Sequence, residues 1–192
     1  MKSLKGSLLI ASPGLMDPNF LRTVIIVAEH SEEGALGLVL NRPAEAKVAE
    51  LWTSISGDSA STELNAFVGG PVQKNALLIL HGHDDLAGGS EAVIPGVYMS
   101  SEVEIFGKLL SRESEPDSEG AKRGLLRVFC GYSGWGPGQL DREMKDGGWL
   151  TCEATSQHVF RDPPDRLWMK AIGGLGGAYE FFSLMPPNPE MN

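Results

Sequence analysis

Two apolar runs joined by a very short polar segment constrain the fold of this 192-residue chain more than any other feature. Residues 23–28 (TVIIVA) form an unbroken, largely β-branched run, which is typical of a strand buried on both faces. Residues 36–40 (LGLVL) form the second run, and the turn between them is built on residues 31–34 (SEEG). Because a parallel crossover needs a dozen or more residues, this spacing predicts an antiparallel hairpin. A purely parallel, doubly wound sheet is therefore disfavoured.

Amphipathic helices are expected at four further places. Apolar residues at positions 48, 51, 52 and 55 follow helical spacing, and Gly57 ends that helix. Ser101 and Glu104 form a capping-box pattern that predicts a second helix starting at Ser101. Residues 139–145 and a segment opened by Pro163 and Pro164 are also predicted to be helical.

Short strands are expected between these helices, at residues 66–68, 76–80, on either side of 95–96, at 125–130 and at 149–152. Residues 113–120 are predicted to form a solvated loop, and the glycine-rich residues 131–138 a second loop. Helices and strands thus alternate irregularly with hairpins among them, which indicates an α+β fold with helices covering a bent, mixed sheet. We expect one domain over residues 1–185 and a flexible tail at 186–192.

Charge and cysteine content narrow the function classes. The chain has 16 Lys and Arg against 25 Asp and Glu, a net charge of −9, which disfavours direct binding to nucleic acid or to an anionic membrane. Cys130 and Cys152 form neither a disulfide framework nor a cysteine-rich zinc site, which fits a reducing cytoplasm. No apolar run approaches the ~18 residues of a membrane span. We therefore expect a cytoplasmic protein.

Common catalytic signatures are missing from the most suggestive segments. The glycines at 134, 136 and 138 do not match a dinucleotide fingerprint, and Trp135 stands where a serine nucleophile elbow needs glycine, so Ser133 is not predicted to be catalytic. His81, His83, Asp84 and Asp85, with His30 as a further ligand, can be interpreted as a metal site or as solvated turn residues. We favour the turn and expect no metal and no cofactor.

Two segments share the pattern Gly-Pro-x-Gln, at residues 70–73 and 136–139. Either they are equivalent sheet corners that offer the amides of Gln73 and Gln139 to a ligand, or they only build turns and cap helices. The second segment also opens a helix, whose free N–H groups favour an anion.

Arg22 and Arg42 flank the two strands of the predicted hairpin at the same end, so they are expected to lie close together. Two guanidinium groups there pair with an internal carboxylate, with Asp17 the nearest candidate, or bind an anionic ligand.

Several of these segments together resemble the YqgE/AlgH family. The shared stretches are residues 6–11 with Pro13, 17–24, Glu29 with His30, 37–43, 69–73 and 131–140, so the resemblance covers nearly the whole chain. It implies a bacterial cytoplasmic protein with an α+β fold, in which a bent mixed, largely antiparallel sheet resembles an incomplete barrel and is flanked by helices. Ser133 stands where the family usually has alanine, and Cys130 where an apolar residue is common.

The resemblance implies no reaction. One branch of the family is named for a regulatory effect on alginate production and is labelled a transcriptional regulator. For this chain the negative charge favours indirect regulation, through a protein or small-molecule partner, over contact with DNA.

Three functional hypotheses remain open. The first is a non-enzymatic binding or regulatory module for a protein or small anionic ligand, with a ligand surface formed by Arg22, His30, Asn41, Arg42, Gln73, Trp135 and Gln139. The second is a hydrolase or transferase for a small anionic substrate, with His30 as general acid and base and Arg22 or Arg42 as the anion clamp. The third is purely structural: the glycine-rich corners only close the sheet.

Overall fold

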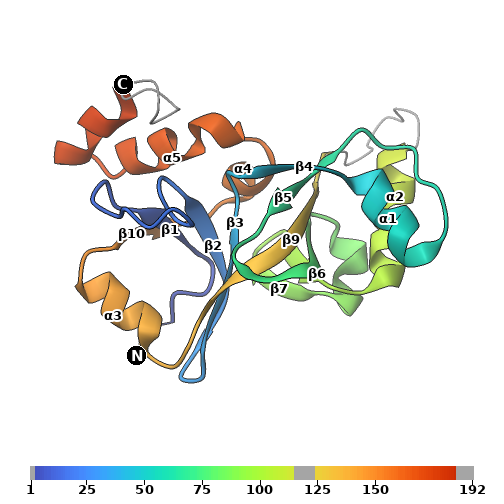
Figure 1. Ribbon diagram of the computed structural model, residues 1–192, viewed down its shortest axis with the longest axis horizontal. Coiled ribbons are helices and arrows are strands. Elements are labelled where there is room, and N and C mark those ends of the chain that lie inside the picture. Colours follow the sequence, from blue (N-terminus) through green and yellow to red (C-terminus); the bar gives the residue numbers. More distant parts are fainter. Residues whose placement is uncertain (1–2, 115–123, 185–192) are drawn as a thin grey trace.

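A curled sheet of ten strands runs through the part of the chain that the computed structural model describes, residues 3–114 and 124–184 (Figure 1). Its main path follows the order β10-β1-β2-β3-β9-β6-β8-β7, with β4 paired to β5. Strand β5 pairs in parallel with β9, and the other pairings are antiparallel. The predicted α+β class, with a bent, largely antiparallel sheet flanked by helices, is confirmed.

The strands are β1 (Ser7–Ala11), β2 (Val24–Ser31), β3 (Gly34–Val39), β4 (Pro43–Lys47), β5 (Asn65–Val68), β6 (Val72–His81), β7 (Glu91–Ile94), β8 (Val97–Ser100), β9 (Leu126–Trp135) and β10 (Trp149–Glu153). The helices are α1 (Val48–Ser56), α2 (Val103–Ser114), α3 (Gln139–Lys145), α4 (Ser156–Phe160) and α5 (Pro164–Gly173), with 3-10 helices η1 (Asp84–Gly89) and η2 (Gly177–Leu184).

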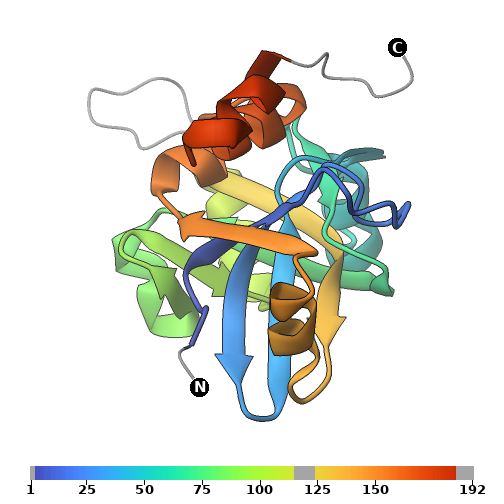
Figure 2. The ribbon, with the colours of Figure 1, turned by 90° about the vertical axis from the view of Figure 1, so that its left-hand side faces the viewer.

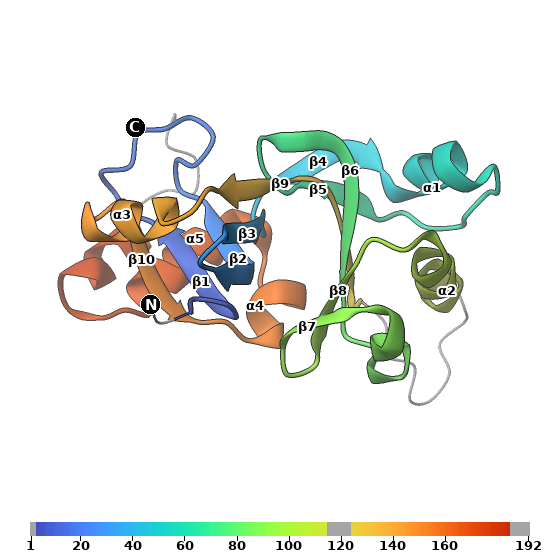
Figure 3. The same cartoon turned by 90° about the horizontal axis from the view of Figure 1, so that it is seen from below.

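Strand β9 belongs to two groups of strands at once. Its first half pairs with β6 and β5, through register partners such as Phe129 with Leu78. Its last three residues pair with β3, where Trp135 lies opposite Ala35. Figure 3 shows β9 passing from the group that contains β4 to β8 to the group that contains β1, β2, β3 and β10. We call these groups the β2 lobe and the β6 lobe.

Strand β2 forms the most deeply buried part of the sheet. Residues 24–28 have no exposed surface at all. Burying a Val or Ile side chain contributes about 1.5–3 kcal/mol, so this strand is a large source of stability. Its antiparallel pairing with β3 confirms the predicted hairpin and the predicted burial on both faces.

Three apolar clusters cover the faces of the sheet. The largest includes Ile26 and Leu38 on one face of the β2 lobe and Trp168 of α5. The opposite face carries Ile25 and Val27 and is covered in part by α3, and the third cluster lies under α1 and α2 in the β6 lobe. Figure 2 shows the β2 lobe with α5 and η2 above the strands and α3 in front of them.

Helices α1, α3 and α5 lie where the sequence predicts them. Helix α1 ends at Gly57, which adopts the left-handed conformation (φ 80°) and donates its N–H to the Thr53 carbonyl, as expected of a helix-ending glycine. Helix α2 begins at Val103, two residues after the predicted start at Ser101, and continues to Ser114. The predicted loop at 113–120 is thus wrong at its first two residues, and the rest of it lies outside the described residues, as does the tail at 186–192.

The prediction of a loop at residues 131–138 is wrong for most of its length. Strand β9 continues to Trp135, because Val72 pairs with Tyr132 on one side and β3 pairs with residues 133–135 on the other. Glycines in this segment and in the segment that faces it permit close approach of the backbones: a Cβ atom on Gly131 would lie 2.8 Å from the Val72 carbonyl oxygen. A Cβ atom on Gly70 would lie 2.2 Å from the Tyr132 carbonyl carbon, a distance that no side chain tolerates.

Within residues 3–114 and 124–184, none of the helices combines the length and the apolar character that crossing a membrane requires.

Candidate functional site

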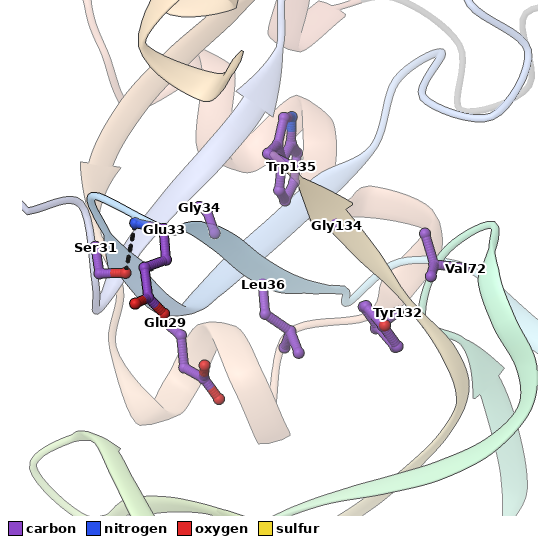
Figure 4. Close-up of a pocket in the computed structure, with 10 residues that line it drawn as sticks. Glu29, Ser31, Glu33, Gly34, Leu36, Val72, Tyr132, Gly134 and Trp135 are labelled. Carbon is purple, nitrogen blue, oxygen red and sulfur yellow. Dashed lines mark hydrogen bonds between the residues drawn. The ribbon is translucent and has the colours of Figure 1, made fainter. Parts of the chain in front are cut away.

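The pocket in Figure 4, of about 470 Å³, lies over β3 and the end of β9. A row of three register partners forms its floor: Glu29 of β2 lies opposite Leu36 of β3, which lies opposite Gly134 of β9. Tyr132, two residues before Gly134 on the same strand, points to the same side, and Val72 closes the pocket from β6.

The absence of a side chain at Gly134 leaves space between Tyr132 and Val72. A Cβ atom on Gly134 would lie 3.3 Å from Cε2 of Tyr132 and 3.6 Å from Cγ2 of Val72, so a larger residue there would fill the space between those side chains. Gly134 needs no unusual backbone conformation, because its φ is not among the positive values. The small size of residue 134 therefore helps to keep this part of the pocket open.

A β-bulge determines which side chains reach the pocket. The register of β2 and β3 shifts between Val27 and Glu29, so Ala28 is an extra residue in β2. Without the shift, strict alternation would place His30 on the face of Ile26 and Ala28. With it, Glu29 shares the pocket face with Leu36, and His30 shares the opposite face with Ala35. Sequence reasoning missed this shift, because nothing in the run at residues 24–28 marks it.

Three polar side chains of the pocket, those of Glu29, Glu33 and Tyr132, are not used inside the described part of the protein. Among the described residues, no hydrogen bond or ion pair engages the carboxylates of Glu29 and Glu33 or the Tyr132 hydroxyl; the Glu33 contact found there is its backbone N–H, which donates to Ser31 Oγ over 3.2 Å. Two carboxylates line the pocket, and no lysine or arginine does. The arrangement offers acceptors at one end and an apolar floor at the other.

A second pocket, of about 600 Å³, lies between residues 12–20 and the α3–β10 connection. Its lining includes Phe20 and Glu143, but Glu143 is fully occupied by internal contacts. Its carboxylate accepts hydrogen bonds from the indole N–H groups of Trp135 (2.9 Å) and Trp149 (2.8 Å) and from the Gln139 amide (2.8 Å). Phe20 packs 5.4 Å from the Trp149 ring, centre to centre, so this cluster serves mainly to hold α3 on the sheet.

Arg22 and Arg42 lie close together at the start of β2, as expected from the hairpin, with Asn41 beside them, and the contacts found there are internal. The Asn41 side chain accepts a hydrogen bond from Val24 N–H and donates one to the Arg22 carbonyl, both over 2.8 Å. Arg42 donates to the Pro18 carbonyl over 3.0 Å, and the Arg22 guanidinium lies 5.2 Å from the centre of the Trp168 ring.

Burial lowers the pKa of Arg42, and the nearby Asp17 carboxylate opposes that shift. The hydrogen bonds of Arg42 to the Pro18 and Leu21 carbonyls, together with the nearby charge of Asp17, favour the internal alternative for this arginine over a ligand-binding role.

His30 lies at the other end of β2 from Arg22. The two positions are eight residues apart along the chain, about 26 Å when extended, which is too far for one small-ligand site. The His30 side chain is only 2% exposed, and its Nδ1 accepts a hydrogen bond from Leu4 N–H over 2.9 Å. Its Nε2 faces Asp141 of α3 at 3.9 Å. A histidine buried in this way does not reach an external substrate.

The two Gly-Pro-x-Gln segments are not equivalent. Gln139 opens α3 and its Oε1 accepts a hydrogen bond from Gly136 N–H over 3.1 Å, as a helix-starting residue can. Gln73 lies within β6, is exposed, and has a positive φ of 43°. Trp135 is 6% exposed and directs its ring away from the pocket, toward α3. Two of the seven predicted ligand-binding residues border a pocket: Trp135 borders the pocket of Figure 4, although its ring is turned away, and Gln139 lines the second pocket.

The histidines considered as metal ligands are held by other contacts. His81 Nε2 lies 2.8 Å from Ser90 Oγ, and burial is the main reason that the pKa of His81 is lowered to about 4. His83 Nδ1 lies 3.1 Å from the Arg112 guanidinium, which also pairs with Asp85. Within the described residues, no three His, Cys, Asp or Glu side chains gather closely enough to hold a metal ion.

Ser133 and the two cysteines do not form a nucleophilic site in the described structure. Ser133 is fully buried and donates its hydroxyl to the Gly69 carbonyl over 3.2 Å. Burial raises the pKa of both the Cys130 and the Cys152 thiols, which makes them less reactive.

Comparison with known proteins identifies the family. Residues 8–180 match the sequence profile of a protein family described as AlgH-like. The chain belongs to the AlgH-like family. Among its relatives, a UPF0301 protein of Chlorobaculum tepidum is 40% identical over 188 residues, covering 97% of this chain and 95% of the relative. A UPF0301 protein of Chlorobium luteolum is 39% identical, covering 97% and 94%.

Solved structures of AlgH-like and similar proteins share the fold. The AlgH protein from Pseudomonas aeruginosa superposes with a TM-score of 0.76 at 30% sequence identity, covering 96% of this chain and 95% of that one. A protein from Corynebacterium diphtheriae gives a TM-score of 0.72 at 21% identity, with coverage of 96% and 94%, which is a likeness of fold alone. The predicted family resemblance is confirmed.

Proposed function

We propose that this AlgH-like protein is a cytoplasmic, non-enzymatic binding module whose small ligand occupies the pocket over β3 and β9. One observation carries the proposal: the row Glu29–Leu36–Gly134 ends in a glycine that leaves a hollow beside Tyr132. Pockets of a few hundred Å³ with an apolar floor and a few polar groups are the usual form of small-molecule sites.

Binding is favoured over catalysis because His30, the proposed acid and base of the enzyme alternative, is buried on the opposite face and lies far along β2 from Arg22. Any regulatory role would then follow from ligand occupancy or from a protein partner, since the net charge of −9 opposes contact with DNA.

The test uses ¹⁵N-labelled protein and three probes of one shape and different charge: phenethylamine, 2-phenylethanol and 3-phenylpropionate. At least one probe is expected to shift the backbone resonances of Leu36, Tyr132 and Gly134 more than those of the second pocket. Gly134→Ala is expected to weaken that binding by fivefold or more, since its methyl group occupies the hollow.

Gly14→Ala is the matched control, because Gly14 lines the second pocket and a Cβ there meets no atom within 4 Å. The melting temperature of each variant shows whether it is folded, and Tyr132→Phe provides a second, milder change in the pocket. If none of the three probes shifts resonances around Leu36 and Gly134 in the folded wild-type protein, the proposed site is wrong.

A further inference from the structure

The charges around the pocket of Figure 4 have one sign. Glu29 and Glu33 are exposed at the end of the pocket beside the β2–β3 turn, while Tyr132 and Val72 lie at the other end. Neither carboxylate has an ion-pair partner among the residues that the structure describes. Lys74 is the nearest basic residue in sequence to Val72, but it is exposed on β6 and does not line the pocket.

The opposite end of the pocket gives independent evidence of a receptor. Exposed acids on a surface are ordinary and need no ligand, but here they border a pocket whose other end stays open beside Gly134, which has no side chain to fill it. Its floor is apolar, with Leu36 and Val72 beside the Tyr132 ring. A ligand that fills this pocket must present an apolar body over the floor and its charged group at the carboxylates.

We infer that the pocket binds a small organic cation, with a protonated amine or guanidinium group between Glu29 and Glu33 and an apolar or aromatic body against Leu36, Tyr132 and Val72. This inference rests on the proposed function and adds the class of its ligand. Two carboxylates without internal partners attract a cation. At physiological salt this attraction extends over about 8–10 Å. A carboxylate ligand in the same position would meet repulsion from both.

The inference departs from the anionic ligand expected from the sequence. That expectation depended on Arg22 and Arg42, which lie at the far end of β2, where Arg42 is hydrogen-bonded to Pro18. The anionic ligand therefore stays a prediction for that end of the strand, and the pocket itself carries the opposite charge.

The same three probes distinguish the existence of the binding site from the charge of its ligand. Phenethylamine is expected to bind at least fivefold more tightly than 2-phenylethanol, and 3-phenylpropionate is expected to bind most weakly, with resonance shifts at Leu36 and Gly134. Glu29→Gln and Glu33→Gln are each expected to weaken phenethylamine binding by about two- to fivefold, the range for a partly exposed ion pair, and to leave 2-phenylethanol binding unchanged.

Glu32→Gln is the matched control, because Glu32 lies in the same turn and does not line the pocket. Raising the salt concentration should weaken phenethylamine binding and leave 2-phenylethanol binding unchanged. If 3-phenylpropionate or 2-phenylethanol binds at Leu36 and Gly134 as tightly as phenethylamine does, the cation inference is overturned while the proposed binding site stands. If no probe binds there, both are overturned.

Discussion

The indole N–H of Trp135 donates a 2.9 Å hydrogen bond to the Glu143 carboxylate, which fastens the end of β9 to α3. Trp149 donates to the same carboxylate oxygen, and both tryptophans are nearly inaccessible to solvent. Glu143→Ala would leave these two indole groups without an acceptor. Since an unsatisfied buried donor costs about 1–3 kcal/mol, we expect the free energy of unfolding in urea to fall by at least about 2 kcal/mol. Glu143→Gln, which keeps an oxygen acceptor, should lose clearly less; an equal loss would contradict this role.

Asn41 replaces missing strand pairing at the start of β2. Its amide bonds to both Val24 N–H and the Arg22 carbonyl, so Asn41→Ala removes two hydrogen bonds to a buried strand. We expect a loss of about 1–3 kcal/mol in the free energy of unfolding. Asn75→Ala on the exposed part of β6 is the control, and it should change stability by less than about 0.5 kcal/mol. Similar values for the two variants would show that the Asn41 contacts contribute little.

Gly37 is required by the close packing of β2 against β3 and Trp135. A Cβ at this position would lie 2.5 Å from Cγ2 of Ile25, within a fully buried part of the sheet. Gly37→Ala is therefore expected to destabilise the protein by about 1–3 kcal/mol through overpacking. Gly88→Ala, where a Cβ meets no atom within 4 Å, serves as the control in the same thermal or urea measurements. A Gly37 variant as stable as the Gly88 variant would be evidence against this packing.

Stability should depend on pH through His81. Burial is the largest cause of its lowered pKa, about 4, so the folded protein resists protonating this ring. The unfolded chain, with an ordinary histidine pKa of about 6.5, binds the proton more readily. The free energy of unfolding should therefore fall as the pH drops from about 6.5 toward 4, and recover as the pH is raised.

The measurement for His81 is urea unfolding at several pH values between 4.5 and 7. The same series with His81→Gln should show a shallower slope, which also separates His81 from His158, whose pKa burial lowers as well. Asp85 does not interfere, because its pKa of about 2 places its titration below this window. An unchanged slope in His81→Gln would show that His81 does not cause the pH dependence.

The sequence predicts the hairpin, three of the helices and the overall class because each rests on a local pattern. Residues 24–28 are apolar without a break, and the spacing at Val48, Leu51, Trp52 and Ile55 is helical. These patterns arise from burial, which acts on neighbouring residues in a regular period. The family resemblance is likewise carried by short motifs and is confirmed over residues 8–180.

The candidate site was harder to predict because it depends on register. The extra residue at Ala28 exchanges the faces of Glu29 and His30, and no residue type announces it. The sequence around Gly134 predicts a loop instead of a strand, because glycine is disfavoured in strands unless a neighbouring backbone approaches closely. The sequence predicts a ligand site at Arg22 and Arg42 because charged residues beside buried strands are unusual. The open pocket is instead bordered by Glu29 and Glu33, ordinary acidic residues at the β2–β3 turn.

Because β9 is shared between the two lobes, it affects how the protein unfolds. If either lobe opened alone, one part of β9 would lose its hydrogen-bonding neighbours while the other part stayed paired. A separated β2 lobe would also expose the backbone of β3, whose second neighbour is the end of β9. We therefore expect the two lobes to unfold together, and fragments of a chain cut between them to need reassociation before either lobe recovers its pairing.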